Sequence, residues 1–257
     1  MTDTKRSPVL FVGHGSPMNA LEDNAFTRTW RDIAARLPHP RAILAISAHW
    51  VTEGVRTSDS VQPRTVHDMF GFPRPLYEVR YGAPGSPELA RQILQLCPDT
   101  SIDNTWGLDH GTWSVLVHMY PEADIPVVQL SLDTGMDAAA HLMLGRSLAP
   151  LRDEGVLIIG SGNVVHNLRL VNWDMEDGYG WADEFDTYIR QRVETRDYQA
   201  VVDYHRAGAS AQKAFPTPEH FWPLLYVLGA ADANDILTVT ADARVMGALS
   251  MTSYLFE

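Results

Sequence analysis

Ten histidines and a single cysteine are the most informative residues of this 257-residue chain. Imidazole binds metals through a neutral ring nitrogen and also transfers protons near neutral pH. Because Cys97 is the only cysteine, an internal disulfide, a Cys-pair zinc ribbon and an iron–sulfur cluster are excluded. A metal site in this protein would therefore consist of histidines, with carboxylates as the other candidate ligands.

Three of the histidines follow stretches that we predict to be buried strands. His14 and His49 each come directly after such a stretch, and His166 lies a few residues beyond another. Ligands bind at the carboxyl ends of the strands in open α/β sheets, where the loops converge. Glycines flank His14 and His166, which lets the backbone approach a metal or ligand closely. We therefore expect the three side chains to meet, although each alone is also explained as a hydrogen-bonded loop residue.

Two further histidines have local sequences that suit a site. His220 lies near the start of a predicted helix, where the helix dipole disfavours imidazolium and keeps the ring neutral for a metal. His110 lies in 106–113, which we interpret as a loop that presents it into a pocket, with Asp109 as its orienting partner. A packing role for His220 and a structural turn at His110 are the alternatives.

Residues 58–84 form a long segment rich in proline and aromatic side chains, which is more typical of a functional lid than of a passive connection. Within it, His67 is a candidate substrate contact. We expect ordinary exposed or packed roles for His39, His118, His141 and His205. Several aromatic residues favour a flat aromatic substrate, with burial in the core as the alternative: Phe70, Phe72, Tyr77, Trp106 and Trp113.

An α/β fold must position these residues. Short apolar runs alternate with longer amphipathic stretches, as in βα units around a largely parallel or mixed sheet. No composition shift marks a domain boundary, so we expect one domain over residues 1–257. The predicted strands are 8–12, 42–47, 125–131, 156–159, 236–240 and 245–254, and the predicted helices are 20–36, 87–96, 137–151, 181–194 and 218–228.

The charge balance narrows the classes of partner. The chain has 20 Lys and Arg against 32 Asp and Glu, a formal net charge of −12. This excess of negative charge argues against nucleic acid and against an anionic membrane surface. We predict no signal peptide and no membrane span, because the apolar runs are too short. With a single cysteine, these features favour the cytoplasm, and we expect a monomer or a small homo-oligomer.

Seven segments, in order and with compact spacing, resemble the 4,5-DOPA extradiol dioxygenase family of the LigB-like class. The resemblance extends from about residue 8 to 254. It implies a single α/β domain around a mixed sheet, of the LigB-like or phosphorylase/hydrolase-like kind. The segments are Gly13-His-Gly-Ser-Pro-Met-Asn19, Ser47-Ala-His-Trp50, His67-Asp-Met-Phe-Gly-Phe-Pro73, Tyr81-Gly-Ala-Pro-Gly-Ser-Pro87, Trp106-Gly-Leu-Asp-His-Gly111, Gly162-Asn-Val-Val-His-Asn-Leu168 and Thr217-Pro-Glu-His220.

The resemblance also implies roles for individual residues. His14, His49 and His220 look like metal ligands. His166 looks like the catalytic base, or a further ligand when zinc is bound, and His110 looks like a second catalytic histidine of the pocket. In the broader class a glutamate stands where His220 is matched here, so the adjacent Glu219 is the alternative ligand.

The implied activity is a metal-dependent extradiol dioxygenase that opens a small, DOPA-like catechol with O2 to give a muconic semialdehyde. Fe²⁺ is the implied metal for ring cleavage, and Zn²⁺ is expected to occupy the same site, because imidazole suits both ions. A zinc-dependent hydrolase is one alternative, since three imidazoles and a water form a catalytic zinc site. A non-catalytic metal-binding protein is another, although binding alone would not need His110 and His166.

Overall fold

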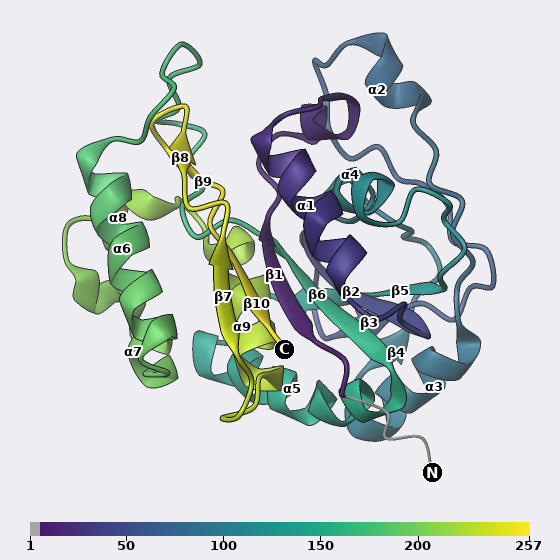
Figure 1. Ribbon diagram of the computed structural model, residues 1–257. Coiled ribbons are helices and arrows are strands. Elements are labelled where there is room, and N and C mark those ends of the chain that lie inside the picture. The colour runs from purple at the N-terminus through teal and green to yellow at the C-terminus, as the bar shows by residue number, and fades with distance from the viewer. Residues whose placement is uncertain (1–5) are drawn as a thin grey trace.

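A mixed sheet of eight strands forms the centre of the computed structural model, which describes residues 6–257 (Figure 1). Its strands are β1 (Val9–Gly13), β2 (Ala42–Thr52), β3 (Arg56–Thr57), β4 (Ser101–Ile102), β5 (Val127–Asp133), β6 (Val156–Gly162), β7 (Leu237–Thr240) and β10 (Ser253–Phe256). Their order across the sheet is β4-β3-β5-β2-β6-β1-β10-β7. Strands β5, β2, β6 and β1 run parallel, whereas β10 is antiparallel to β1 and β7. The prediction of a mixed, largely parallel sheet flanked by helices is confirmed.

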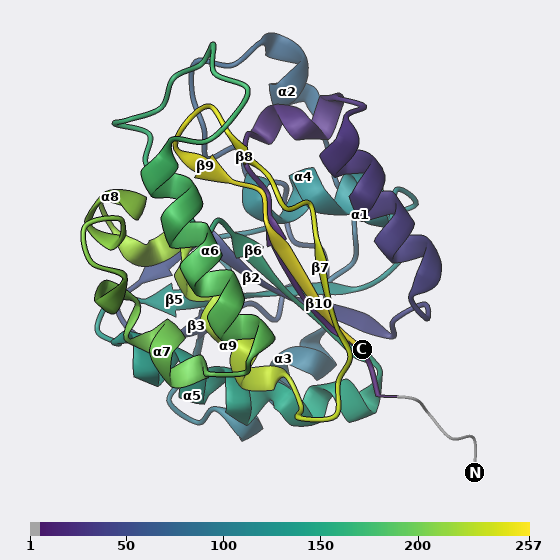
Figure 2. The same cartoon turned by 60° about the vertical axis from the view of Figure 1, so that its left-hand side comes forward.

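Helices cover both faces of this sheet, as the two views show (Figures 1 and 2). The α-helices are α1 (Ala25–Arg36), α2 (Arg74–Glu78), α3 (Pro87–Leu96), α4 (His110–Met119), α5 (Ala138–Leu148), α6 (Gly180–Glu194), α7 (Tyr198–Val202), α8 (Ala211–Ala214) and α9 (Trp222–Ala230). Short 3₁₀ segments are η1 (Pro17–Leu21), η2 (Ala149–Glu154), η3 (Tyr204–Ala207) and η4 (Pro218–His220). Within residues 6–257, no helix has both the length and the apolar character needed to cross a bilayer.

The central strands are buried on both sides, which explains their continuous apolar runs. In β1, Val9 and Phe11 belong to a core that includes residues of α5, α6 and α9. Leu10 and Val12 belong to a second core, which includes residues of α1 and α4. Because both faces of β1 and its neighbours are packed, the residues at their carboxyl ends have a rigid support.

The carboxyl-terminal part of the chain departs from the predicted elements. The predicted strand 245–254 is divided among β8 (Arg244–Val245), β9 (Leu249–Ser250) and β10, because β8 and β9 pair with each other around a turn in which Gly247 has a φ of 74°. The predicted helix 218–228 is divided into η4 and α9. Pro223 lies in the first turn of α9, a position that suits a residue without an N–H.

Two other boundaries were wrong for reasons of helix capping. The predicted helix 20–36 is divided into η1 and α1, because Asn24 accepts the N–H groups of Phe26 and Thr27 and caps α1. The segment 106–113 is not all loop, since Asp109 accepts the N–H of Thr112 and α4 begins at His110. His110 is therefore held on the first turn of a helix rather than on a free loop.

Candidate metal centre

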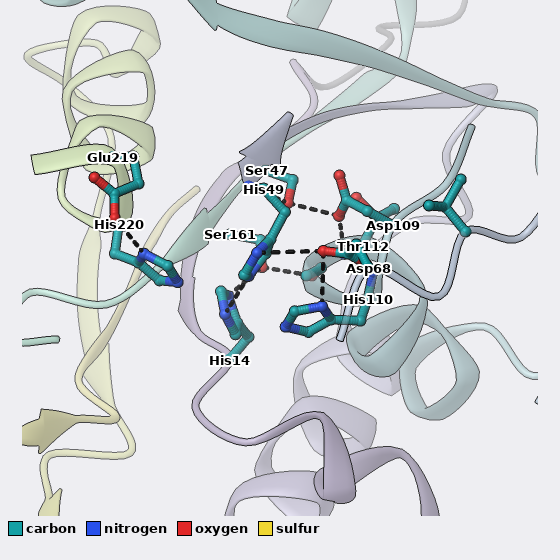
Figure 3. A network of polar contacts seen from close by, with 12 residues as sticks. His14, Ser47, His49, Asp68, Asp109, His110, Thr112, Ser161, Glu219 and His220 are labelled. Carbon is teal, nitrogen blue, oxygen red and sulfur yellow. Dashed lines mark hydrogen bonds and ion pairs between the residues drawn. The ribbon is translucent and has the colours of Figure 1, made fainter. Parts of the chain in front are cut away.

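Five histidines lie together at the carboxyl ends of the central strands, and Figure 3 shows four of them. The ring centroids of His14 and His49 are 5.2 Å apart, and the ring of His220 lies 5.4 Å from His14 and 4.9 Å from His49. His166 stacks on His220 with its centroid at 3.5 Å and an interplanar angle of 3°. His110 lies 3.8 Å from His49. The sheet edge thus brings together all five histidines that the sequence indicated.

Different elements carry the three innermost rings. His14 follows β1 directly, and His220 is the last residue of η4. His49 lies within β2, which is longer than predicted, in the stretch where its register with β5 shifts between Ile46 and Val51. This irregularity lies at the edge of the sheet next to the site, where such features re-aim side chains.

The tautomer of His14 is set by a buried serine. The Ser161 hydroxyl donates to the carbonyl oxygen of Gly111 at 2.5 Å, so its single proton is used. At 3.0 Å from His14 Nδ1, the same oxygen must therefore accept an N–H from the ring. His14 consequently carries its proton on Nδ1 and presents an unprotonated Nε2 to its neighbours.

The same pattern holds for the other two inner histidines. Nδ1 of His49 lies 3.3 Å from a carboxylate oxygen of Asp68, and Nδ1 of His220 lies 3.4 Å from a carboxylate oxygen of Glu219. A carboxylate accepts an N–H, so the Glu219 hydrogen bond places the proton of His220 on Nδ1, and the negative charge of Asp68 favours the same tautomer for His49. Outer partners of this kind hold histidines that bind metals.

The three lone pairs converge. Each of His14, His49 and His220 offers a ring nitrogen, and these atoms all lie within 4.8 Å of one another. The Nε2 atoms of His14 and His49 face each other at 3.2 Å, and Nε2 of His220 is buried without a hydrogen-bond partner within the described residues. A cation bound by all three would satisfy these acceptors, so the residues fit a metal ion.

Burial keeps these rings neutral. Loss of hydration lowers the pKa of His14, His49 and His220 well below the ordinary value, and the neighbouring histidines lower it further. For His49 the nearby Asp68 opposes this effect. Neutral imidazole is the form that binds a metal, so no proton has to leave before an ion enters at neutral pH.

His110 is oriented by Asp68 and not by Asp109, which corrects the sequence-based expectation. Asp68 accepts from Nδ1 of His110 at 2.9 Å and from its backbone N–H at 2.9 Å (Figure 3). Sequence reasoning missed Asp68, whose only signal was its place beside His67 in the aromatic segment. The sequence-based expectation selected Asp109 because it is adjacent to His110. In the structure, the carboxylate of Asp109 caps α4 and does not contact the His110 ring.

Asp109 instead ties together the elements around the site. Its buried carboxylate accepts from the Ser47 hydroxyl at 2.6 Å, from Trp106 Nε1 at 3.1 Å and from the Gln129 amide at 2.5 Å. Ser47 in turn accepts the backbone N–H of His49 at 3.2 Å. Burial raises the pKa of Asp109, and the charge of Asp68 adds to that effect.

His166 completes the cluster from the loop that follows β6. It lies beyond β6, where its backbone N–H donates to the carbonyl oxygen of Ala214 at 2.8 Å. Burial lowers the pKa of His166 to about 4, and the charge of His110 adds to this shift. The ring is therefore neutral at neutral pH and able to accept a proton.

The five histidines line a cavity of about 300 Å³, and most of the other residues that line it are apolar. Phe70 and Phe72 line it, as does Trp173, which the sequence analysis did not single out. His67 does not line it, contrary to our expectation, because its Nε2 faces the carbonyl oxygen of Val79 at 3.1 Å and the Arg80 guanidinium. Several other residues considered earlier also lie outside the lining: Tyr77, Trp106, Trp113, His39, His118, His141 and His205.

A family comparison covers almost the whole chain. Residues 7–256 match the family model described as the catalytic LigB subunit of aromatic ring-opening dioxygenase. The chain belongs to the LigB family. The ring-opening dioxygenase activity and the family that the sequence motifs indicated are confirmed at this level.

Two similar proteins carry the name of an extradiol dioxygenase. A protein of Escherichia coli K12 named 4,5-DOPA dioxygenase extradiol is 48% identical over 257 residues, covering 96% of this chain and 94% of the relative. A Beta vulgaris protein of the same name is 40% identical, covering 96% and 95%. The crystal structure of an uncharacterized protein from Escherichia coli K12 superposes with a TM-score of 0.85 at 44% identity, covering 98% of this LigB chain and 100% of that one.

Proposed function

We propose that this protein is an Fe²⁺-dependent extradiol dioxygenase that opens a small, DOPA-like catechol with O2 to give a muconic semialdehyde. The observation that carries the proposal is that ring nitrogens of His14, His49 and His220 lie within 4.8 Å of one another in the lining of the cavity. The family match over residues 7–256 supports the view that the chain acts as one catalytic domain.

Bound at these three nitrogens, Fe²⁺ would supply a centre that chelates both catechol oxygens and binds O2. Zn²⁺ is suited to the same three nitrogens, because imidazole is a ligand for both ions. Glu219 is better placed as the partner of His220 Nδ1 than as a ligand, since its carboxylate lies 3.4 Å from that nitrogen.

The chain's own residues would handle the protons. His166 is neutral and lines the cavity, so it is suited to accept a phenolic proton as the substrate binds. His110 keeps its Nδ1–H on Asp68, which leaves Nε2 to accept a hydrogen bond from a substrate hydroxyl, or to take up that proton and later return it. The rings of Phe70 and Phe72 would cover a flat substrate and exclude water.

The test is anaerobic loading with Fe²⁺, followed by L-DOPA or another catechol and then air. We expect oxygen uptake and a yellow ring-opened product. His14→Ala should abolish metal binding, whereas His166→Ala should lower turnover more than it lowers iron affinity. Equal loss of iron in both variants would make His166 a ligand rather than the base. Tight zinc with ester hydrolysis, and no oxygen uptake on any catechol, would refute the dioxygenase and support a zinc hydrolase.

A further inference from the structure

Asp68 makes contacts that join two histidines of different proposed roles. One of its carboxylate oxygens, Oδ2, lies 2.9 Å from Nδ1 of His110 and 3.3 Å from Nδ1 of His49. The other oxygen, Oδ1, accepts the backbone N–H of His110 at 2.9 Å. The side chain of Asp68 is only 10% exposed. Within residues 6–257, its ion pairs are with these two histidines alone.

These contacts determine the protonation pattern of both rings. An ionised carboxylate only accepts hydrogen bonds, so Nδ1 of His110 carries a proton, and the same charge at 3.3 Å favours a proton on Nδ1 of His49. Both Nε2 atoms are then free for the cavity. Asp68 also lies at the amino-terminal end of α4, where the helix dipole favours a negative charge. The ionised form is thus supported by the helix as well as by the two rings.

The contacts also attach the aromatic segment 58–84 to two histidines that line the cavity. Asp68 is followed directly by Met69 and Phe70, and both line the cavity. The segment is therefore anchored at the point where it passes the histidines. A change at Asp68 would act on the orientation of the rings and on the residues that cover the substrate.

We propose that Asp68 is a positioning residue of the dioxygenase, which fixes the Nδ1–H tautomer of His49 for metal binding and that of His110 for hydrogen bonding to the substrate. This inference rests on the proposed function. In this proposal, one carboxylate is the outer hydrogen-bond partner of both a metal ligand, His49, and a second pocket histidine, His110.

The isosteric variant Asp68→Asn tests the tautomer directly. An amide has one acceptor and one donor in place of two acceptors, so either Nδ1 or the backbone N–H of His110 must face another donor. In the zinc-loaded protein, ¹⁵N NMR of the imidazole nitrogens should show that His110 leaves the pure Nδ1–H form. Zinc affinity should fall about 10-fold to 100-fold, the range for loss of an outer partner. Turnover of the iron-loaded enzyme should fall by at least a similar factor.

Asp59→Asn is the matched control, because it removes one negative charge from the same segment. The exposed Asp59 accepts from the Asn104 amide at 2.8 Å, and it does not line the cavity. This control should match the wild-type protein in NMR spectrum, zinc affinity and turnover. Equal losses in the two variants would show an effect of net charge and would overturn the proposal.

Rescue separates positioning from a general loss of structure. In Asp68→Ala, added formate should restore part of kcat and the Nδ1–H signal of His110, while formate should not accelerate the wild-type enzyme. An Asp68→Asn variant whose spectrum and zinc affinity were both identical to wild type would overturn the proposal. If no catechol is consumed even by the wild-type enzyme, the proposed function fails, but the zinc-affinity and NMR measurements still decide the positioning role.

Discussion

Replacement of Ser161 by alanine tests whether an outer hydroxyl fixes the metal-binding form of His14. The Ser161 hydroxyl is the atom that accepts the Nδ1–H of His14 and donates to Gly111. In Ser161→Ala this N–H loses its acceptor in a position that is only 1% exposed, and the ring is free to move its proton to Nε2. The protonated Nε2 cannot bind a metal, so the affinity of the site should fall.

The size of the effect follows from the role of the contact. Loss of an outer partner costs about 10-fold to 100-fold in metal affinity, which corresponds to about 1.4–2.8 kcal/mol. A buried group left unpaired costs about 1–3 kcal/mol, which is the same range. We therefore expect the dissociation constant for Zn²⁺ to rise about 10-fold to 100-fold in Ser161→Ala.

The assay is competition for Zn²⁺ between the protein and a fluorescent chelator, with Ser114→Ala as the matched control. Ser114 lies in α4 with its hydroxyl buried and without a hydrogen-bond partner within the described residues. Its removal should leave zinc affinity unchanged. If the two serine variants bound Zn²⁺ equally, the hydroxyl of Ser161 would not set the tautomer and the reasoning would be refuted.

Two other measurements test parts of the structure away from the metal ligands. Burial lowers the pKa of His141 to about 4, so between about pH 6.5 and pH 4 the unfolded chain binds a proton that the folded chain does not. The free energy of unfolding therefore falls as the pH falls through this window, by about 3 kcal/mol at the low end. In urea unfolding, His141→Asn should show a flatter dependence of this free energy on pH than the wild-type protein. An unchanged profile would contradict the buried neutral state. Phe70 lines the cavity and is 89% exposed. Phe70→Ser should raise KM for catechols about 5-fold to 30-fold, because the substrate loses about 1–2 kcal/mol of apolar contact. Because the side chain is exposed, the stability of the protein should change little. Val61→Ser, in the same segment and 70% exposed but outside the cavity lining, should leave KM unchanged, and equal effects would argue against substrate contact at Phe70.

Local sequence patterns were sufficient to find the main elements and the histidines. The apolar runs of β1, β2 and β6 indicate strands buried on both faces, and the topology of parallel strands predicts that residues after them share one edge. His14 follows β1 in this way, whereas His49 lies within β2, which is longer than predicted. His220 was found from its place at a helix start, although that start proved to be a 3₁₀ turn followed by α9.

The outer contacts of the site could not be predicted in the same way. The pairing of Asp68 with His110 joins residues 42 positions apart, and that of Ser161 with His14 joins residues 147 apart. Hydrophobic periodicity carries no information about such pairs. Asp109 was chosen as the partner of His110 because it is adjacent in sequence, whereas capping of α4 and the bond to Ser47 direct its carboxylate away.

The pairing of β1 with β10 has a consequence for biosynthesis. The strand that leads to His14 is the first strand within residues 6–257, and one of its two neighbours in the sheet is Ser253–Phe256. Its other neighbour, β6, is also distant in sequence. Strands that are so distant in sequence pair slowly. Until they pair, the exposed edge of β1 favours aggregation. We therefore expect metal loading to follow synthesis of the whole sheet, and a chain that stops before residue 253 to leave β1 without its partner on one side.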